Sequence, residues 1–382
     1  MSVKTKRIFA FDALRAVMML LGLVLHTSAT YGEVDKLAEW PFLDPLNTHL
    51  FFDVVIGIIH LFRMPVFFVI SGFFGALLFY ERSPRRMLLN RVRRIILPFI
   101  VFLCVLYPIL RFTFQAATAG YYGAAHPFVE AWEFVLNISL IPDSTAHLWF
   151  LYYLGMFSVL TWCLALLLRK IPALTHLLRR VFRRLHSSLP AAILVLSALI
   201  FILFERMQVT DAYTSTSLLP DGRTFAFYVT FYWYGWLFFM EKKEILQRNF
   251  FYKTNLSLGV IFFFIKAVLY LECSPEVAFY PIIICNALAV WCFIFGFIGW
   301  FLRKFDRPSA RMRYISDASY WVYLIHLPLT ALLPTLLFGY DIFVGLKWLF
   351  VFCVTTGFCF VTYHFFVRKT FIGRFLNGQK KR

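Results

Sequence analysis

The chain has 382 residues, of which 61% are hydrophobic and 20% aromatic, whereas only 15% are charged. Soluble globular domains carry about 25% charged residues, so this composition excludes a soluble enzyme or binding module and makes lipid the expected solvent. The formal net charge of +18 would suit a nucleic-acid-binding protein. However, the Lys and Arg residues alternate with apolar segments along the whole chain, which is the pattern of a membrane protein.

Apolar segments close to the length of a bilayer core recur from end to end and predict an all-α integral membrane protein of about ten transmembrane helices. The first is too long and too charged for a cleaved signal peptide. No long polar block interrupts the series, so residues 1–382 are expected to form one membrane domain. The expected spans are roughly 8–31, 50–80, 95–118, 146–168, 188–205, 223–240, 254–272, 278–301, 314–337 and 342–367.

The distribution of basic residues predicts the orientation. Ten spans place both termini on one side, and the six segments expected there hold 30 of the 38 Lys and Arg residues. These segments are the N-terminus, loops 81–94, 169–186, 241–253 and 302–313, and the tail from residue 368. The opposite loops hold Lys36, Arg206 and Arg223 and are rich in acids. Lys and Arg concentrate in cytoplasmic loops, so both termini are expected in the cytoplasm.

Motifs of metal, nucleotide or redox chemistry do not occur. The sequence has no GxGxxG, P-loop, GxSxG or HExxH pattern. Cys104, Cys163, Cys285 and Cys353 lie in apolar segments without metal-ligand spacing, so we expect reduced core cysteines and no bound metal.

The first span contains Asp12, Arg15 and His26, and ionisable groups inside a membrane are costly enough to be functional candidates. At about 100° per residue, His26 lies within about 20° of Arg15 around the helix and roughly 16 Å further along it. His26 could act as the general base for an acceptor hydroxyl, or be a core histidine bonded across helices. Asp12 and Arg15 suit either a direct role or a structural ion pair.

Other polar residues in apolar segments are further candidates. His326, in the ninth span, either faces the same site as His26 or packs in an aromatic core. Arg63 precedes Pro65, which predicts a kinked or broken second span. Its guanidinium could bind a carboxylate or an acyl carbonyl, or it could snorkel or pair with Asp53. Gly72 is expected to serve close helix packing.

Two groups of residues near the ends of spans suit substrate binding. His147, Trp149 and Tyr152 open the fourth span at the outer side, where they could bind an acceptor or form the interfacial aromatic belt. Arg91 and Arg94 belong to a dense basic run on the cytoplasmic side. Guanidinium groups match phosphate geometry, so this run could dock a phosphorylated donor, or it could serve orientation and anionic lipid.

These residues resemble the acyltransferase 3 family of membrane O-acyltransferases. Its Arg, ten residues, His pattern in the first span is matched by Arg15 and His26, and its cytoplasmic Arg-x-x-Arg before the third span by Arg91 and Arg94. The segments FRMPVFFVISGFF, HLWFLYYLGMF and SYWVYLIHLPLT are also similar, so the resemblance covers nearly the whole chain. The combination of segments is most similar to members that succinylate periplasmic glucans.

The resemblance implies a cytoplasmic acyl-CoA donor, with succinyl-CoA expected, an extracytoplasmic glycan acceptor and a bacterial inner membrane location. It implies that His26 is the base, that Arg91 and Arg94 face the CoA phosphates, and that Asp12 and Arg15 position the donor end. His326, Arg63 and His147 would be further members of the site. Some relatives carry a fused outer hydrolase-like domain, for which this sequence has no counterpart, so the acceptor is expected to reach the membrane unaided.

Two other interpretations fit the intramembrane charges. A transporter of an acidic or lipid-linked solute would show flux without covalent change. A sensor or scaffold in an envelope-polymer complex would need the charged residues for stability alone. The paired Arg motifs favour the enzyme.

Overall fold

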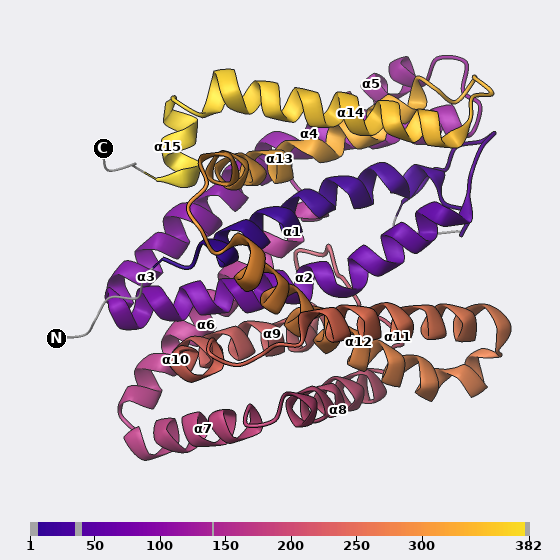
Figure 1. Cartoon of the computed structure of the whole chain (residues 1–382). Coiled ribbons are helices and arrows are strands. Elements are labelled where there is room, and N and C mark those ends of the chain that lie inside the picture. Colours follow the sequence, from indigo (N-terminus) through magenta and orange to yellow (C-terminus); the bar gives the residue numbers. More distant parts are fainter. Residues whose placement is uncertain (1–6, 35–39, 140, 379–382) are drawn as a thin grey trace. The chain divides into compact units, whose positions relative to one another are not determined.

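The computed structural model describes residues 7–34, 40–139 and 141–378, and every regular element within these ranges is a helix (Figure 1). The all-α prediction is therefore confirmed for this part of the chain. Six of the Lys and Arg residues used to predict the orientation lie outside the described residues: Lys4, Lys6, Lys36, Lys380, Lys381 and Arg382.

The chain forms two compact units, each assembled from separate segments. Unit 1 contains Met1–Arg15, Leu61–Ile95 and Trp149–Ser309, and unit 2 contains Ala16–His60, Ile96–Leu148 and Ala310–Arg382. Helices α1 (Phe9–Ser28) and α2 (Leu50–Glu81) each contribute to both units. The expectation of one membrane domain over residues 1–382 stays a prediction.

Unit 1 is built mainly from long apolar helices, among which α11 packs along α12, and α12 along α8 (Figure 1). Its complete elements are α3 (Pro84–Arg91), α6 (Trp149–Arg169), α7 (Pro172–Leu185), α8 (Leu189–Met207), α9 (Gly222–Met240), α10 (Lys242–Ile245), α11 (Tyr252–Glu272) and α12 (Pro275–Phe305). A π-helical turn, η2 (Val92–Ile96), follows α3. Side chains cap two starts: Ser83 accepts from the Arg86 N–H, and Asp221 from the Thr224 N–H.

The crossing of α2 and α9 in unit 1 depends on two glycines. A Cβ at Gly72 would lie 2.0 Å from the Tyr232 carbonyl oxygen, and a Cβ at Gly235 would lie 1.9 Å from that of Val69. Only glycine lets the two backbones come this close. The packing role predicted for Gly72 is confirmed, and Gly235 is its counterpart.

In unit 2, α13 packs against both α4 and α14, and α4 also packs against α5 (Figure 1). Its elements, besides its parts of α1 and α2, are η1 (Ala29–Tyr31), α4 (Leu97–Tyr121), α5 (Pro127–Asn137), η3 (Ala146–Leu148), α13 (Ala310–Thr335), α14 (Val344–Thr362), η4 (Tyr363–Val367) and α15 (Phe371–Asn377). One apolar cluster joins Leu23, Val322 and Cys359 from three different helices. This cluster fixes α1 against α13 and α14.

A buried ion pair holds the segment after α1 in place. Lys347 Nζ lies 3.0 and 2.8 Å from the two carboxylate oxygens of Asp44, and neither side chain is exposed to solvent. The backbone N–H of Asp44 donates to the Thr30 carbonyl at 2.8 Å, which turns the segment back onto the end of α1. The pair therefore ties this segment to α14.

Eight helical segments of the described residues are long and apolar enough to cross a membrane. They account for eight of the ten predicted spans. The other two predicted spans coincide with the helices α9 and α13, which are less apolar than these eight segments. Both are rich in Tyr and Trp, and α13 also carries Arg311, Arg313 and Asp317. The protein is thus a multi-pass membrane protein, while the count of ten and the cytoplasmic termini stay predictions.

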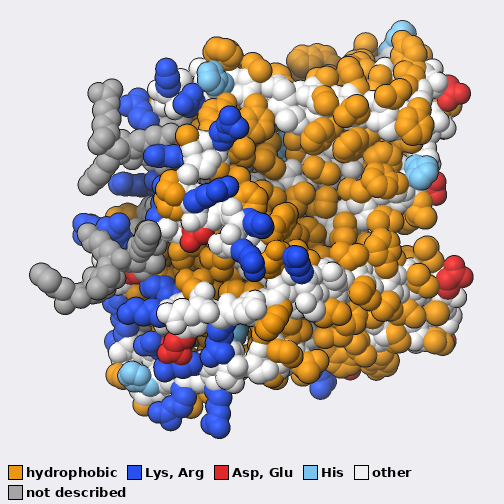
Figure 2. Space-filling model, viewed as in Figure 1, with side chains coloured by type: hydrophobic (Ala, Val, Ile, Leu, Met, Phe, Trp, Pro, Cys, Tyr) orange, Lys and Arg blue, Asp and Glu red, His pale blue; other side chains and the backbone are white. Residues whose placement is uncertain are grey.

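The surface agrees with a lipid environment. Figure 2 shows a broad hydrophobic surface on which the Lys and Arg side chains gather rather than spread evenly. On α11, for example, Ile261, Ile265 and Val268 are 51%, 44% and 58% exposed. Aliphatic side chains exposed in this way along a helix need lipid around them.

Several local predictions were wrong. The second span is not broken at Pro65, because α2 runs without interruption from Leu50 to Glu81, while the kink expected there as the alternative stays a prediction. Loop 169–186 contains the helix α7. All seven cysteines are free, but of the four expected in the core only Cys285 is buried, whereas Cys104, Cys163 and Cys353 are exposed on helix surfaces.

Candidate active site

Asp12 lies near the start of α1 in unit 1 and forms an ion pair with Arg7. Arg7 Nη2 is 2.7 Å from Asp12 Oδ2, whereas the closest distance from Arg15 to this carboxylate is 3.9 Å. The Arg15 guanidinium lies over the Phe74 ring, 5.8 Å from its centroid. The structural ion pair considered for Asp12 and Arg15 is therefore a long contact, and among the described residues Arg7 lies closer to Asp12.

Three histidines meet in unit 2. The ring centroids of His26 on α1 and His326 on α13 are 5.2 Å apart, and His147, from η3, is 5.5 Å from His326. His147 and His326 are buried, and His26 is partly buried. Of the two alternatives left open for His326, the structure has the one in which it lies beside His26, and His147 joins them; we call these three side chains the histidine cluster.

Backbone carbonyls determine which ring nitrogens carry hydrogen in two of these histidines. His326 Nδ1 lies 3.0 and 2.9 Å from the carbonyl oxygens of Val322 and Tyr323, and His147 Nε2 lies 3.0 Å from that of Leu324. A carbonyl can only accept, so these nitrogens are donors. In the neutral rings the lone pairs are then at His326 Nε2 and His147 Nδ1, so both can accept a proton.

Tyr323 and Trp40 complete the surroundings of the cluster. The Tyr323 hydroxyl donates to the His147 backbone carbonyl at 2.8 Å, which fixes η3 against α13. The Trp40 ring is stacked on His26 with the centroids 6.0 Å apart, and its indole N–H donates to Thr30 Oγ1 at 3.1 Å. The sequence analysis missed Trp40, because its contact with His26 depends on how the segment after α1 folds back.

The proposed donor-binding arginines differ in exposure. Arg91 is only 9% exposed, and its Nη2 donates to the Ser71 carbonyl at 3.1 Å, next to the Tyr232 hydroxyl at the crossing of α2 and α9. Arg94 is exposed in the π-helical turn η2. Arg63 lies partly buried on α2. Within the Arg-x-x-Arg pattern, Arg91 therefore fixes α3 to α2, whereas Arg94 faces outward.

Two of the residues proposed to bind an acceptor pack inside unit 1. Trp149 is 7% exposed and its ring centroid lies 5.2 Å from that of Tyr228. The Tyr152 hydroxyl donates to the Leu218 carbonyl at 2.7 Å. Trp149 is thus buried in protein rather than part of an interfacial belt, and the roles proposed for both stay predictions.

The histidine cluster does not have the arrangement of a metal site in the described part of the chain. Among the residues that the structure describes, no group of three or more His, Cys, Asp and Glu side chains is arranged to hold a metal ion. What the cluster can do with its own groups is accept, hold and return a proton.

Comparison with known proteins agrees with the resemblance seen in the sequence. Curated relatives include proteins named Glucans biosynthesis protein C from Salmonella paratyphi B, Salmonella dublin and Salmonella enteritidis PT4. Each is 27% identical to this chain over 348 residues, which covers 86% of this chain and 84% of the relative. No solved structure matches significantly. The sequence profile of the acyltransferase domain of the acyltransferase 3 family matches residues 8–364, so the chain belongs to this family.

Proposed function

We propose that the protein transfers an acyl group, expected to be succinyl, from cytoplasmic acyl-CoA to a hydroxyl of an extracytoplasmic glycan. The observation that carries the proposal is the histidine cluster, formed by a chain that belongs to an acyltransferase family. The glycan acceptor and the succinyl group are suggested by the name and the likeness of the curated relatives. The setting is the bacterial inner membrane, with both termini in the cytoplasm.

His26 is the general base in this proposal. Its imidazole takes the proton of the acceptor hydroxyl, whose oxygen attacks the thioester carbonyl carbon. A C–O bond forms, the C–S bond breaks, and the imidazolium returns the proton to the departing CoA thiolate, so atoms and charge balance. The ring contacts of His26 with Trp40 and His326 limit its rotation, which supports this role.

His326 and His147 support this proton transfer as positioning residues. Their lone-pair nitrogens, assigned from the carbonyl contacts, allow them to accept hydrogen bonds from a donor group in the site. His326 is the nearer of the two to His26. Replacing His326 by Gln keeps a hydrogen-bond acceptor near the position of Nε2, so it should preserve more activity than His326→Ala.

The arginines of unit 1 are assigned to the donor. Arg94 is exposed and carries a guanidinium fork suited to the CoA phosphates, while Arg91 fixes the segment that presents it. Asp12, Arg15 and Arg63 are proposed to position the acyl end of the donor. His147, Trp149 and Tyr152 remain proposed neighbours of the acceptor.

Mass spectrometry of envelope glycans tests the function. Cells that express the wild-type chain should show one specific acyl mass on a glycan, and His26→Ala should lower it by about 10²- to 10⁴-fold. His126→Ala is the matched control, because His126 is exposed just before α5 and belongs to no proposed site. An unchanged glycan profile, together with solute flux that needs the protein, would overturn the enzyme in favour of a transporter.

A further inference from the structure

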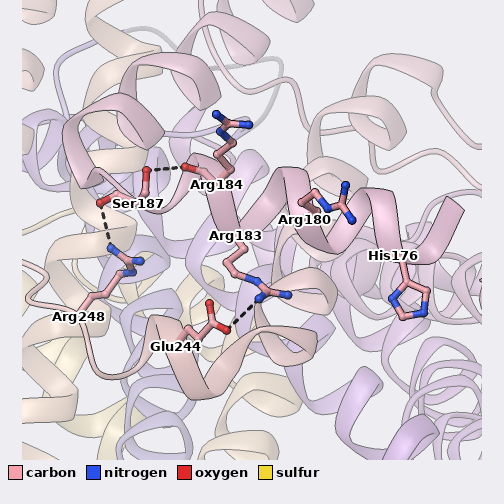
Figure 3. A pocket seen from close by; sticks show the side chains of 7 residues that line it. All are labelled: His176, Arg180, Arg183, Arg184, Ser187, Glu244 and Arg248. Carbon is pink, nitrogen blue, oxygen red and sulfur yellow. Dashed lines mark hydrogen bonds and ion pairs between the residues drawn. The ribbon is translucent and has the colours of Figure 1, made fainter. Parts of the chain in front are cut away.

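A basic cavity opens in unit 1 among residues that play no part in the proposed acyl transfer. Its volume is about 530 Å³, within the usual size of small-molecule sites. It is lined from α7, α10 and the segments that follow them, as Figure 3 shows, by His176, Arg180, Arg183, Arg184, Ser187, Glu244 and Arg248. We call it the α7 cavity.

Two of its four arginines are fixed by hydrogen bonds and ion pairs. Arg183 Nη1 lies 3.3 Å from Glu244 Oε1, and Arg183 Nε lies 3.1 Å from Glu241 Oε2. Arg248 Nη1 donates to the Ser187 carbonyl at 3.0 Å (Figure 3). These contacts hold one wall of the α7 cavity in a fixed geometry before any ligand arrives.

The other two arginines keep their charge available. Arg180 and Arg184 are exposed and form no ion pair with any residue in the described part of the chain. With Glu244 as the only carboxylate among the lining residues, the α7 cavity has a formal charge of +3, taking His176 as neutral. Such a charge excess in a preformed cavity favours an anion.

The lining residues identify the chemical class of that anion. No Phe, Tyr, Trp or aliphatic side chain lines the α7 cavity, so nothing there would stack on a nucleobase or cover an acyl chain. Guanidinium groups bind phosphate oxygens through paired N–H donors. We propose that the α7 cavity is a binding site for phosphate groups, and this inference does not depend on the acyl-transfer proposal.

The apolar face of α7 indicates where the ligand can come from. Leu174, Leu177, Leu178 and Val181 are 38–57% exposed and lie together on one side of the helix, beside the side that carries the arginines. An exposed apolar face beside a basic one is typical of a helix at the surface of a membrane. The phosphate could therefore belong to a soluble metabolite or to the headgroup of an anionic phospholipid, and the two sources need separate probes.

Binding measurements on the full chain test the site. For the soluble source, calorimetry in a neutral detergent at fixed ionic strength would use inorganic pyrophosphate. For the lipid source, native mass spectrometry would count phosphatidylglycerol retained from nanodiscs of equal phosphatidylglycerol and phosphatidylcholine. The test variant is Arg180→Gln with Arg184→Gln, and the control is Arg311→Gln with Arg313→Gln, which removes the same charge from exposed positions on α13.

We expect the test variant to weaken pyrophosphate binding by at least about tenfold, or to lose its preference for phosphatidylglycerol, with the control unchanged. A loss in the first measurement assigns a soluble ligand, and a loss in the second alone assigns a lipid headgroup. The proposal is overturned if the wild type binds neither probe or if both double variants behave alike. Neither result changes the glycan test, which reports on His26.

Discussion

Unit 1 carries several ion pairs between helices together with Arg180 and Arg184, which form none in the described part of the chain, whereas unit 2 combines a buried ion pair with a cluster of three histidines. In unit 1, Glu81 pairs with Lys242 at 3.0 Å, and Glu241 lies between Arg179 and Arg183. In unit 2, the Asp44–Lys347 pair is inaccessible to solvent and the histidine cluster is bonded to backbone carbonyls. In unit 1 the acids thus neutralise part of the basic charge, and the arginines of the α7 cavity keep an excess of it, whereas in unit 2 the charged pair is buried and the ring nitrogens lie at a different place.

The largest expected effect on stability concerns the ion pair of unit 2. Lys347→Met should lower the free energy of unfolding by about 3–5 kcal/mol, because it leaves the Asp44 carboxylate buried without its cation. Thermal unfolding in detergent measures it. Lys369→Met, at an exposed position, should change stability by less than about 0.5 kcal/mol. Equal effects of the two substitutions would mean that the pair does not hold unit 2.

A pH dependence is expected from unit 1. Burial lowers the pKa of His186, between α7 and α8, from 6.5 to about 4, and the nearby Arg248 adds to the shift. The folded state then binds fewer protons than the unfolded state, so stability falls by up to about 1.4 kcal/mol per pH unit between pH 6.5 and 4. Thermal unfolding measured across this range should show a smaller change of stability with pH in His186→Phe and an unchanged one in His176→Ala. If stability changes with pH in His186→Phe as it does in the wild type, His186 is not the source of this pH dependence.

Replacing a glycine by alanine is expected to change stability in opposite directions in the two units. Gly235→Ala should destabilise by about 1–3 kcal/mol, because the added Cβ meets the Val69 carbonyl of the backbone, which cannot move aside easily. Gly357→Ala on α14 of unit 2 meets no atom within 4 Å and should stabilise by about 0.5–1 kcal/mol through helix propensity. Unfolding midpoints that shift in the same direction would contradict the close crossing.

The smallest effect is expected for the bond between η3 and α13. Tyr323→Phe removes the hydroxyl that donates to the His147 carbonyl and should cost about 0.5–1.5 kcal/mol. Since the bond positions His147, glycan acylation should fall more than the amount of folded protein does. Acylation that simply follows the amount of protein would assign Tyr323 a structural role alone.

Helical periodicity was enough to predict α1, whereas the position of His326 beside His26 was one of two alternatives that its segment left open. The burial of Arg91 could not be predicted, because it depends on the space left beside Gly75 at the crossing of α2 and α9. Trp40 was missed because a loop brings it to His26. The helix α7 was taken for a loop because its arginines hid the apolar residues spaced three and four apart.

The most direct test of the central claim separates donor binding from acyl transfer. Purified wild-type protein and His26→Ala would each be titrated with succinyl-CoA and then supplied with acceptor glycan. The account predicts that His26→Ala binds succinyl-CoA with wild-type affinity and forms no acylated glycan. Acylated glycan at the wild-type level would contradict the assignment of His26 as the base, and loss of succinyl-CoA binding would place His26 in the donor site instead.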